Sequence, residues 1–174
     1  MDELEEIRHY YAEELRAVAN LQSEAVVKAF AKVPREHFLG SGPWEVFTPY
    51  SETGWTTKDA DPKELYHNLL VTMDAERRLN NGYPSFLAFL IEQLELKSGD
   101  HAVHVGCGPG YYTAIMAELA GPTGRVTAIE IDSELARRAR RNLSYLPQIK
   151  IIGKLSIRQI GILSGAWWKD DESW

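Results

Sequence analysis

One continuous segment, residues 101–132, constrains the fold of this chain more than any other. His101–Val105 is a short apolar run of strand length, and the glycine-rich residues 106–110 interrupt it. Tyr111–Ala120 has the composition of a helix, a turn follows, and residues 125–131 are again β-branched and apolar. The order strand, glycine loop, helix and strand predicts half of a nucleotide-binding α/β unit.

Bulk composition narrows the class of protein. A chain of 174 residues with 44% hydrophobic residues is long enough for one domain with its own core. The formal net charge of −6 argues against a nucleic-acid partner, and no apolar run of the sequence reaches the length of a membrane-spanning helix. The single cysteine, Cys107, excludes an internal disulfide, and with no evident signal peptide it predicts a cytoplasmic protein. The histidines lack the spacing of metal ligands, so we expect no metal site.

Residues 1–83 are expected to form an N-terminal region of helices and loops. Apolar residues recur at steps of three and four between residues 3 and 20, which predicts an amphipathic helix, and Pro34 ends a second helix. Residues 38–57 are rich in Gly, Pro, Ser and Thr and are predicted to be a long ordered loop. Residues 65–73 fit either a short strand or a helical turn.

Two further regions follow in the chain. Residues 84–153 are expected to form an α/β half-domain. Pro84 suits the first position of a helix that runs to about Lys97, the glycine loop comes next, and a third strand is predicted near Ile152. Residues 154–174 lose this pattern and are expected to be an atypical tail.

The glycine loop and an acidic residue beyond it form one constellation. Gly106, Gly108 and Gly110 let the chain turn sharply and let a ligand approach without a Cβ in the way. Glu130 lies 20 positions after Gly110 (130 − 110), where a carboxylate can accept hydrogen bonds from ribose hydroxyls. The sixth position of a dinucleotide fingerprint is Tyr111 here, and no glycine, which argues against a dinucleotide. On the residues alone, a dinucleotide site and a purely structural glycine turn stay open as alternatives.

The potentially reactive side chains near the loop are expected to have structural roles. His104 is expected to be packed or hydrogen-bonded and not catalytic. Cys107 is expected to fill space in the loop, because a reactive thiol needs a lowered pKa. The arginines within residues 137–141 are expected to form an exposed helix face, with a phosphate-binding patch as the alternative.

Three stretches carry a resemblance to a known family: residues 29–38 (AFAKVPREHF), 89–99 (FLIEQLELKSG) and 103–130 (VHVGCGPGYYTAIMAELAGPTGRVTAIE). With them the chain resembles class I S-adenosylmethionine-dependent methyltransferases, and most of all the protein-L-isoaspartate O-methyltransferases. The resemblance implies an α/β, Rossmann-like methyltransferase fold in which N-terminal helices precede a doubly wound sheet. It also implies that S-adenosylmethionine is the cofactor, that Gly106, Gly108 and Gly110 contact it, and that Glu130 holds its ribose.

Ahead of the glycine loop the chain departs from that family. The family carries a T-I-S-x-P segment before the helix that precedes the loop, and its serine lies at the active site. The corresponding stretch here reads NNGYP, so that the proline is kept as Pro84 and the serine position falls on Gly82. Asn80, Asn81 and Ser85 are therefore the candidates for the missing polar group, and an ordinary helix-leading turn is the alternative.

A second departure follows the third strand. The family has a G-D-G-like turn there, whereas residues 153–156 read GKLS and lack the acid. We therefore expect an incomplete doubly wound sheet, in a relative that is truncated or altered after about residue 152. Two functions follow as hypotheses. One is a methyltransferase that acts on a carboxylate or other oxygen of a peptide or protein substrate. The other is a catalytically inactive methyltransferase-fold protein that acts as a binding module, with self-association through an exposed sheet edge.

Overall fold

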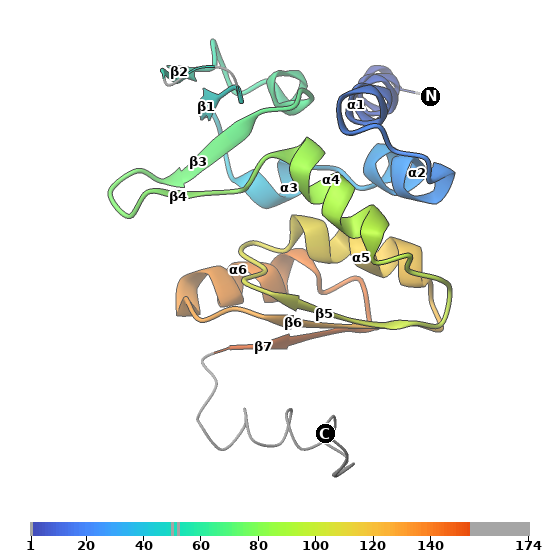
Figure 1. Ribbon diagram of the computed structural model, residues 1–174. Helices are drawn as coiled ribbons and strands as arrows, with labels where there is room; N and C mark the ends of the chain where they lie inside the picture. The colour runs from blue at the N-terminus through green and yellow to red at the C-terminus, as the bar shows by residue number, and fades with distance from the viewer. Residues whose placement is uncertain (1, 50, 52, 154–174) are drawn as a thin grey trace, which may run out of the picture.

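A computed structural model describes residues 2–49, 51 and 53–153 of the chain. The N-terminal helices and a small antiparallel sheet lie at one end, a parallel sheet lies at the other, and further helices lie between them (Figure 1). Among the described residues, no helix is both long and apolar enough to cross a membrane. The atypical tail predicted at 154–174 lies outside the described residues.

The first two N-terminal helices form where the sequence predicts them, and a short third helix, which the sequence does not predict, follows them. The first begins after Asp2, whose carboxylate accepts the backbone N–H of Glu5 at 2.7 Å, and it ends at Asn20 in a left-handed conformation. The hydroxyl of Ser23 accepts the backbone N–H of Val26 and so caps the second helix. The three helices of this region are α1 (Glu3–Ala19), α2 (Glu24–Lys32) and α3 (Glu36–Leu39).

A small antiparallel sheet occupies residues that were expected to be a loop. The prediction of a long loop over residues 38–57 is wrong, because two short strands lie there and Val46 pairs with both Trp55 and Val71. Strands of two and three residues have no recognisable period, so only their distant partners define them. Residues 65–73 contain the end of a 3₁₀ helix, η1 (Pro62–Leu65), and the start of a strand. The strands are β1 (Glu45–Phe47), β2 (Trp55–Thr56), β3 (Leu70–Asp74) and β4 (Leu79–Asn80), in the order β2-β1-β3-β4.

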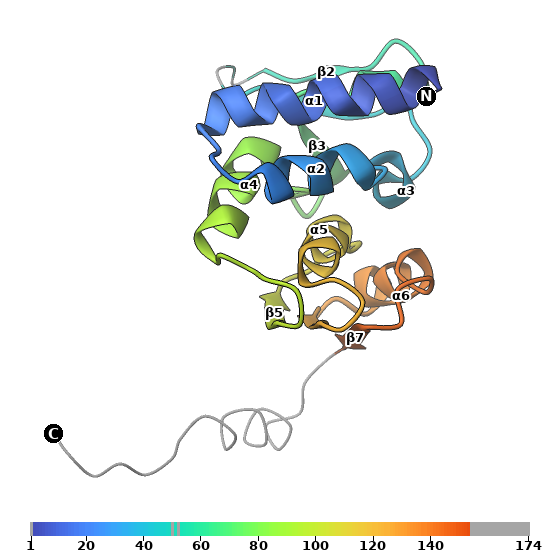
Figure 2. The same ribbon diagram turned by 90° about the vertical axis from the view of Figure 1, so that its right-hand side faces the viewer.

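The predicted strand, loop, helix and strand unit is confirmed as part of a three-stranded parallel sheet. His104 pairs with Ala128, and Ala128 pairs with Ile151, in the order β5-β6-β7. Helices α5 and α6 cover one face of this sheet (Figure 2), and the described residues place no helix on the other face. The fold is thus Rossmann-like with an incomplete sheet, as predicted. Its elements are α4 (Pro84–Gln93), β5 (His101–Val105), α5 (Tyr111–Ala120), β6 (Arg125–Ile129), α6 (Ser133–Asn142) and β7 (Ile149–Ile152).

One hydrophobic core joins the N-terminal helices to the parallel sheet. Tyr111, the first residue of α5, is only 2% exposed, and its ring centroid lies 6.1 Å from that of Phe30 and 5.6 Å from that of Phe38. The same cluster of buried side chains includes Val126 and Ala128 of β6. Tyr111 therefore fastens α5 to α2 and α3. The core draws on both sides of the boundary expected at residue 83, and that division of the chain stays a prediction.

Arg35 ties the loop between η1 and β3 to the N-terminal helices. Its side chain is fully buried, and its guanidinium donates hydrogen bonds to the backbone carbonyls of Leu65, His67 and Leu69. The guanidinium carbon also lies 5.8 Å from the centre of the Tyr11 ring. Arg35, which belongs to the VPRE stretch of the family resemblance, thus has a structural role.

Helix α4 exposes an apolar stripe. It begins at Pro84 as predicted but ends at Gln93 and not near Lys97, because Glu95 adopts a left-handed backbone with φ 48°. Ala88 and Ile91 are the side chains by which it enters the core. The exposed residues are Phe86 (59%), Phe89 (44%), Leu90 (41%) and Leu94 (52%). On the same side of the molecule lies β5, an edge strand (Figure 2).

Candidate functional site

Backbone hydrogen bonds within the glycine loop and to the end of β6 hold the loop in place. The N–H groups of Gly106 and Cys107 both donate to the carbonyl of Ile129, at 2.8 and 3.1 Å. The N–H of Gly110 donates to the carbonyl of Cys107 at 3.0 Å. All three glycines have positive φ, 74° at Gly106, 54° at Gly108 and 103° at Gly110, a region that other residues rarely adopt. The loop is therefore a preformed turn between β5 and α5.

Glu130 fixes the loop from the end of β6. Its side chain is 6% exposed, and one carboxylate oxygen accepts the N–H of Gly108 at 2.7 Å. The other oxygen accepts the N–H of Asp132 at 2.9 Å. An ionised carboxylate has about four acceptor positions, so each oxygen keeps one for a further donor. The sequence links Gly108 and Glu130 by spacing, and the structure joins them by a hydrogen bond.

The three glycines have different surroundings. Among the residues that the structure describes, a Cβ built on Gly106 meets no atom within 4 Å, and one on Gly108 meets only the methyl group of Met73, at 3.9 Å. A Cβ on Gly110 would lie 2.6 Å from Leu143 of the segment after α6. Gly110 therefore serves close packing, whereas Gly106 borders open space that a ligand can use.

A small cavity lies beside the loop. It has a volume of about 60 Å³, room for about two waters, so a nucleotide-sized ligand must extend beyond it. Asn80 and Asn81 lie in its wall together with Gly106 and Gly108, so two of the three candidate polar residues meet the glycine loop. Ser85 is not part of the wall. The remaining lining residues are Leu39, Met73, Cys107, Pro109, Tyr111 and Tyr112.

The turn that carries Asn80 and Asn81 is fixed on two sides. The side-chain oxygen of Asn80 accepts the N–H of Gly82 at 3.0 Å, and the side-chain oxygen of Asn81 accepts the N–H of Val71 at 2.6 Å. The hydroxyl of Tyr112 donates to the carbonyl of Gly82 at 3.2 Å. The turn is thus anchored to β3 and to α5, and both asparagines lie next to the loop as a consequence.

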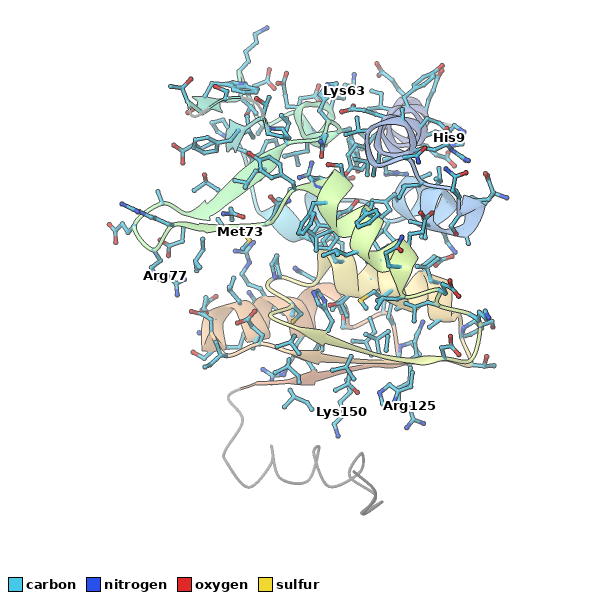
Figure 3. The ribbon with its side chains drawn as sticks, in the orientation of Figure 1. His9, Lys63, Met73, Arg77, Arg125 and Lys150 are labelled. Atoms are coloured by element: carbon cyan, nitrogen blue, oxygen red, sulfur yellow. The ribbon has the colours of Figure 1, made fainter. Side chains whose placement is uncertain are left out.

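Arg77 links the β3–β4 hairpin to the start of α6. Its guanidinium donates to Asp74 at 2.7 Å and forms a second ion pair with Asp132. Figure 3 shows Arg77 and Met73 on the hairpin, on the side that faces α6. Asp132 also caps α6 through the N–H groups of Glu134 and Leu135. The hydrogen bond from Leu135, and then the contact with Arg77, lower the pKa of Asp132.

His104 and Cys107 are structural, as predicted. The Nδ1 atom of His104 lies 2.8 Å from the hydroxyl oxygen of the fully buried Thr113, and burial lowers the pKa of His104. Burial raises the pKa of the Cys107 thiol to about 11, so this thiol is protonated at neutral pH.

The arginines of α6 are mostly exposed, and one of them, Arg138, connects α6 to α3. Arg137 pairs with Glu134 within the helix, whereas Arg138 donates to the backbone carbonyl of Phe38 at 3.2 Å. Arg140 and Arg141 face solvent. The predicted exposed face is confirmed, with Arg138 as a contact between α6 and α3 that the sequence pattern does not reveal.

Comparison with known proteins identifies the family. A profile described as protein-L-isoaspartate(D-aspartate) O-methyltransferase matches residues 8–158, most of the chain. The chain belongs to this family. The predicted resemblance is therefore confirmed, and the glycine loop, Glu130 and the turn at residues 80–82 are parts of an isoaspartyl-methyltransferase fold.

Individual members of the isoaspartyl methyltransferase family give the same answer. The chain is 33% identical over 147 residues to protein-L-isoaspartate O-methyltransferase of Ignicoccus hospitalis, a match that covers 82% of this chain and 58% of that protein. It is 34% identical over 142 residues to protein-L-isoaspartate O-methyltransferase 2 of Archaeoglobus fulgidus, covering 82% and 55%. The chain thus spans little more than half the length of these relatives.

Solved structures of the family share the fold. A protein-L-isoaspartate O-methyltransferase superposes with a TM-score of 0.61 at 25% identity, covering 82% of this chain and 41% of that one. A Plasmodium falciparum structure described as a protein of this kind in complex with S-adenosyl-L-homocysteine gives 0.64 at 18% identity, covering 90% and 68%. The second likeness speaks for the fold alone.

Several residues around this candidate site have no signal in the sequence. Met73 and Arg77 reach the loop and α6 because β3 and β4 form a hairpin, and neither strand has a period that predicts the pairing. The hydroxyl of Tyr112 donates to the carbonyl of Gly82, a contact that no pattern in the sequence indicates. The unusual pair Asn80-Asn81 beside a glycine was the one local signal.

Proposed function

We propose that this chain binds S-adenosylmethionine along the glycine loop and the end of β6. The observation that carries the proposal is the open space at Gly106, in a loop whose neighbouring carboxylate, Glu130, is already oriented by Gly108 and Asp132. The remaining acceptor positions of Glu130 suit the two ribose hydroxyls. Family membership and the bound S-adenosyl-L-homocysteine of the P. falciparum structure support the same ligand.

The reaction that we propose is transfer of a methyl group to a carboxylate oxygen of a peptide or protein, and the family name, protein-L-isoaspartate(D-aspartate) O-methyltransferase, supports it. S-adenosylmethionine supplies an activated methyl group, and the residues of this chain bind and orient donor and acceptor. A carboxylate acceptor is already ionised at neutral pH and needs no general base. This agrees with a cavity wall whose described residues include no carboxylate and no histidine.

Asn80 and Asn81 are the residues that we propose for acceptor or cofactor contacts, with Ser85 as a more distant candidate. Both asparagines line the cavity. The backbone N–H of Ser85 donates to Asn68, away from the loop. At the family's serine position, Gly82 has φ 74°, and a Cβ there would lie 3.0 Å from Leu87. A serine is therefore disfavoured in this backbone, and neighbouring polar groups must take its part.

A methyl-transfer assay tests this function. The protein is incubated with tritiated S-adenosylmethionine and either an isoaspartyl peptide or the same peptide with a normal aspartyl residue. We expect base-labile methyl ester to form on the isoaspartyl peptide. Transfer to neither peptide, by folded protein that does bind the cofactor, would favour the non-catalytic alternative.

The second candidate function is a binding module that associates with a second copy of itself. The observation in its favour is the edge strand β5, which lies on the same side as the exposed apolar stripe of α4. The sequence predicted self-association at the edge of the third strand, β7, and β5 is a second such edge. Size-exclusion chromatography with light scattering decides: a dimer supports this candidate, and a monomer at high concentration contradicts it.

We further propose a cytoplasmic protein that takes part in the repair of damaged proteins. The single cysteine, buried and protonated, suits a reducing compartment. Repair follows from the proposed methylation of isoaspartyl groups. Fractionation of the source cells, followed by detection of the chain, tests the location, and enrichment outside the cytosolic fraction would contradict it.

A further inference from the structure

Asn81 has a buried amide nitrogen that finds no hydrogen-bond partner among the described residues. Asn81 is 8% exposed, and no acceptor in the described part of the chain lies within hydrogen-bond distance of its Nδ2 atom. The orientation of the amide is fixed, because Oδ1 accepts the N–H of Val71 at 2.6 Å and a nitrogen in its place would meet another donor. Buried donors are almost always paired, so an unpaired one at a cavity points to a ligand atom.

The position of this donor is preorganised. Asn81 lies in the cavity wall with Gly106 and Gly108 of the glycine loop. Its backbone N–H donates to the carbonyl of Val71 at 3.1 Å, and the next residue, Gly82, is held by Tyr112. A donor fixed between β3 and α5 needs no rearrangement to receive an acceptor atom.

The charged groups near the cavity indicate which kind of carboxylate ligand can bind to Asn81. Among the described residues, no Asp, Glu, Lys, Arg or His side chain lies in its wall, and the carboxylate of Glu130 is bonded to the loop, 2.7 Å from the backbone nitrogen of Gly108. A lone carboxylate ligand is repelled by Glu130. An α-amino-acid group carries its own ammonium, so it has no net charge and meets no such repulsion from Glu130.

We propose that Asn81 Nδ2 donates a hydrogen bond to the carboxylate of the α-amino-acid end of the cofactor. Asn81 is thereby a binding residue for the part of S-adenosylmethionine that lies beyond its ribose. The inference rests on the proposed function, since it needs that cofactor. It assigns a ligand group to a residue that differs from the isoleucine of the family's T-I-S-x-P segment.

The decisive variant is Asn81→Asp. Aspartate keeps the oxygen that accepts the Val71 N–H, removes the Nδ2 donor and adds a negative charge. The probes are S-adenosyl-L-homocysteine, which carries the amino-acid end, and 5′-methylthioadenosine, which lacks it. By calorimetry we expect the affinity for S-adenosyl-L-homocysteine to fall at least about tenfold, the effect of losing a hydrogen bond to a charged group. The affinity for 5′-methylthioadenosine should stay within about twofold on the same reasoning.

Asn68→Asp is the matched control. It makes the same chemical change at a residue that is also 8% exposed, and it keeps the oxygen that accepts the N–H of Ser85. We expect it to bind both probes as the wild type does. Wild type that binds neither probe would overturn the proposed function. Wild type that binds both, with Asn81→Asp unchanged toward both, would overturn this inference alone.

A measurement on the wild type keeps the inference testable if Asn81→Asp does not fold. The side-chain amide signals of asparagines appear in ¹H–¹⁵N correlation spectra, and that of Asn81 is assigned through its own backbone. We expect this signal to shift on addition of S-adenosyl-L-homocysteine and to stay in place with 5′-methylthioadenosine. If the side-chain signal of Asn81 does not shift with either probe while the backbone signals of the loop glycines do, the proposed role of Asn81 is contradicted.

Discussion

The glycines of the loop differ in what they do, and alanine substitutions separate their roles. In Gly110→Ala a residue with a side chain is forced to φ 103°, and its Cβ lies 2.6 Å from Leu143. Backbone strain of this kind costs about 1–3 kcal/mol, and overpacking of a filled core adds about 1–3 kcal/mol. We therefore expect the free energy of unfolding to fall by about 2–6 kcal/mol.

Gly106→Ala is the matched comparison. Its φ of 74° carries the same kind of strain, but its Cβ meets no atom of the described residues within 4 Å, so the loss is limited to about 1–3 kcal/mol. Its new methyl group projects into the space proposed for the cofactor, so cofactor affinity should fall as well. Urea unfolding followed by circular dichroism measures both losses. With a slope of about 2 kcal/mol per molar, Gly110→Ala lowers the midpoint by about 1–3 M. Equal midpoints for the two variants would refute the assignment of Gly110 to packing.

Three further predictions concern stability. Arg35→Met leaves the carbonyls of Leu65, His67 and Leu69 without their donor and should lower the free energy of unfolding, measured by urea titration, by about 3–6 kcal/mol. Arg35→Lys should cause a smaller loss. A loss below about 1 kcal/mol for Arg35→Met would contradict the structural role of Arg35. Burial lowers the pKa of His104, so below about pH 6.5 the folded state binds fewer protons than the unfolded state, and the free energy of unfolding should decrease as the pH falls. His104→Asn should flatten this pH dependence of stability between about pH 7.5 and 5. An unchanged slope would exclude His104 as its source. Ser23→Ala removes the cap of α2 and should lower the thermal midpoint by the equivalent of about 1 kcal/mol, whereas an unchanged midpoint would show that the cap contributes nothing.

The unit from β5 to α6 could be predicted from the sequence because its signals are local. A glycine loop after an apolar run defines where β5 ends, and the predicted helix at residues 111–120 agrees with α5 at both ends. The following strand was predicted to residue 131 and ends at Ile129, where Glu130 turns inward to bond the loop. The glycine loop and Glu130 each follow a predicted strand, and parallel strands bring their carboxyl ends to the same edge, so the sequence predicts that they lie together. The hydrogen bond from Gly108 to Glu130 agrees with that prediction.

The small antiparallel sheet and the buried polar ties could not be predicted. Strands β1 and β2 are too short to show a period, and their pairing with β3 depends on residues far along the chain. A buried arginine cannot be told from a surface arginine by its letter, so the role of Arg35 emerges only from its three carbonyl partners. The same holds for Asn81: the sequence marks it as polar, and only the structure reveals which of its atoms is already used.

Binding of the cofactor by the wild-type chain tests the central claim most directly. Isothermal titration calorimetry of the folded protein with S-adenosylmethionine should give saturable binding with one site per chain. Gly106→Ala, whose methyl group enters the proposed site, should weaken that binding while the circular dichroism spectrum stays that of a folded protein. No heat of binding from well-folded wild type, or identical affinity for wild type and Gly106→Ala, would contradict the placement of the cofactor at this loop.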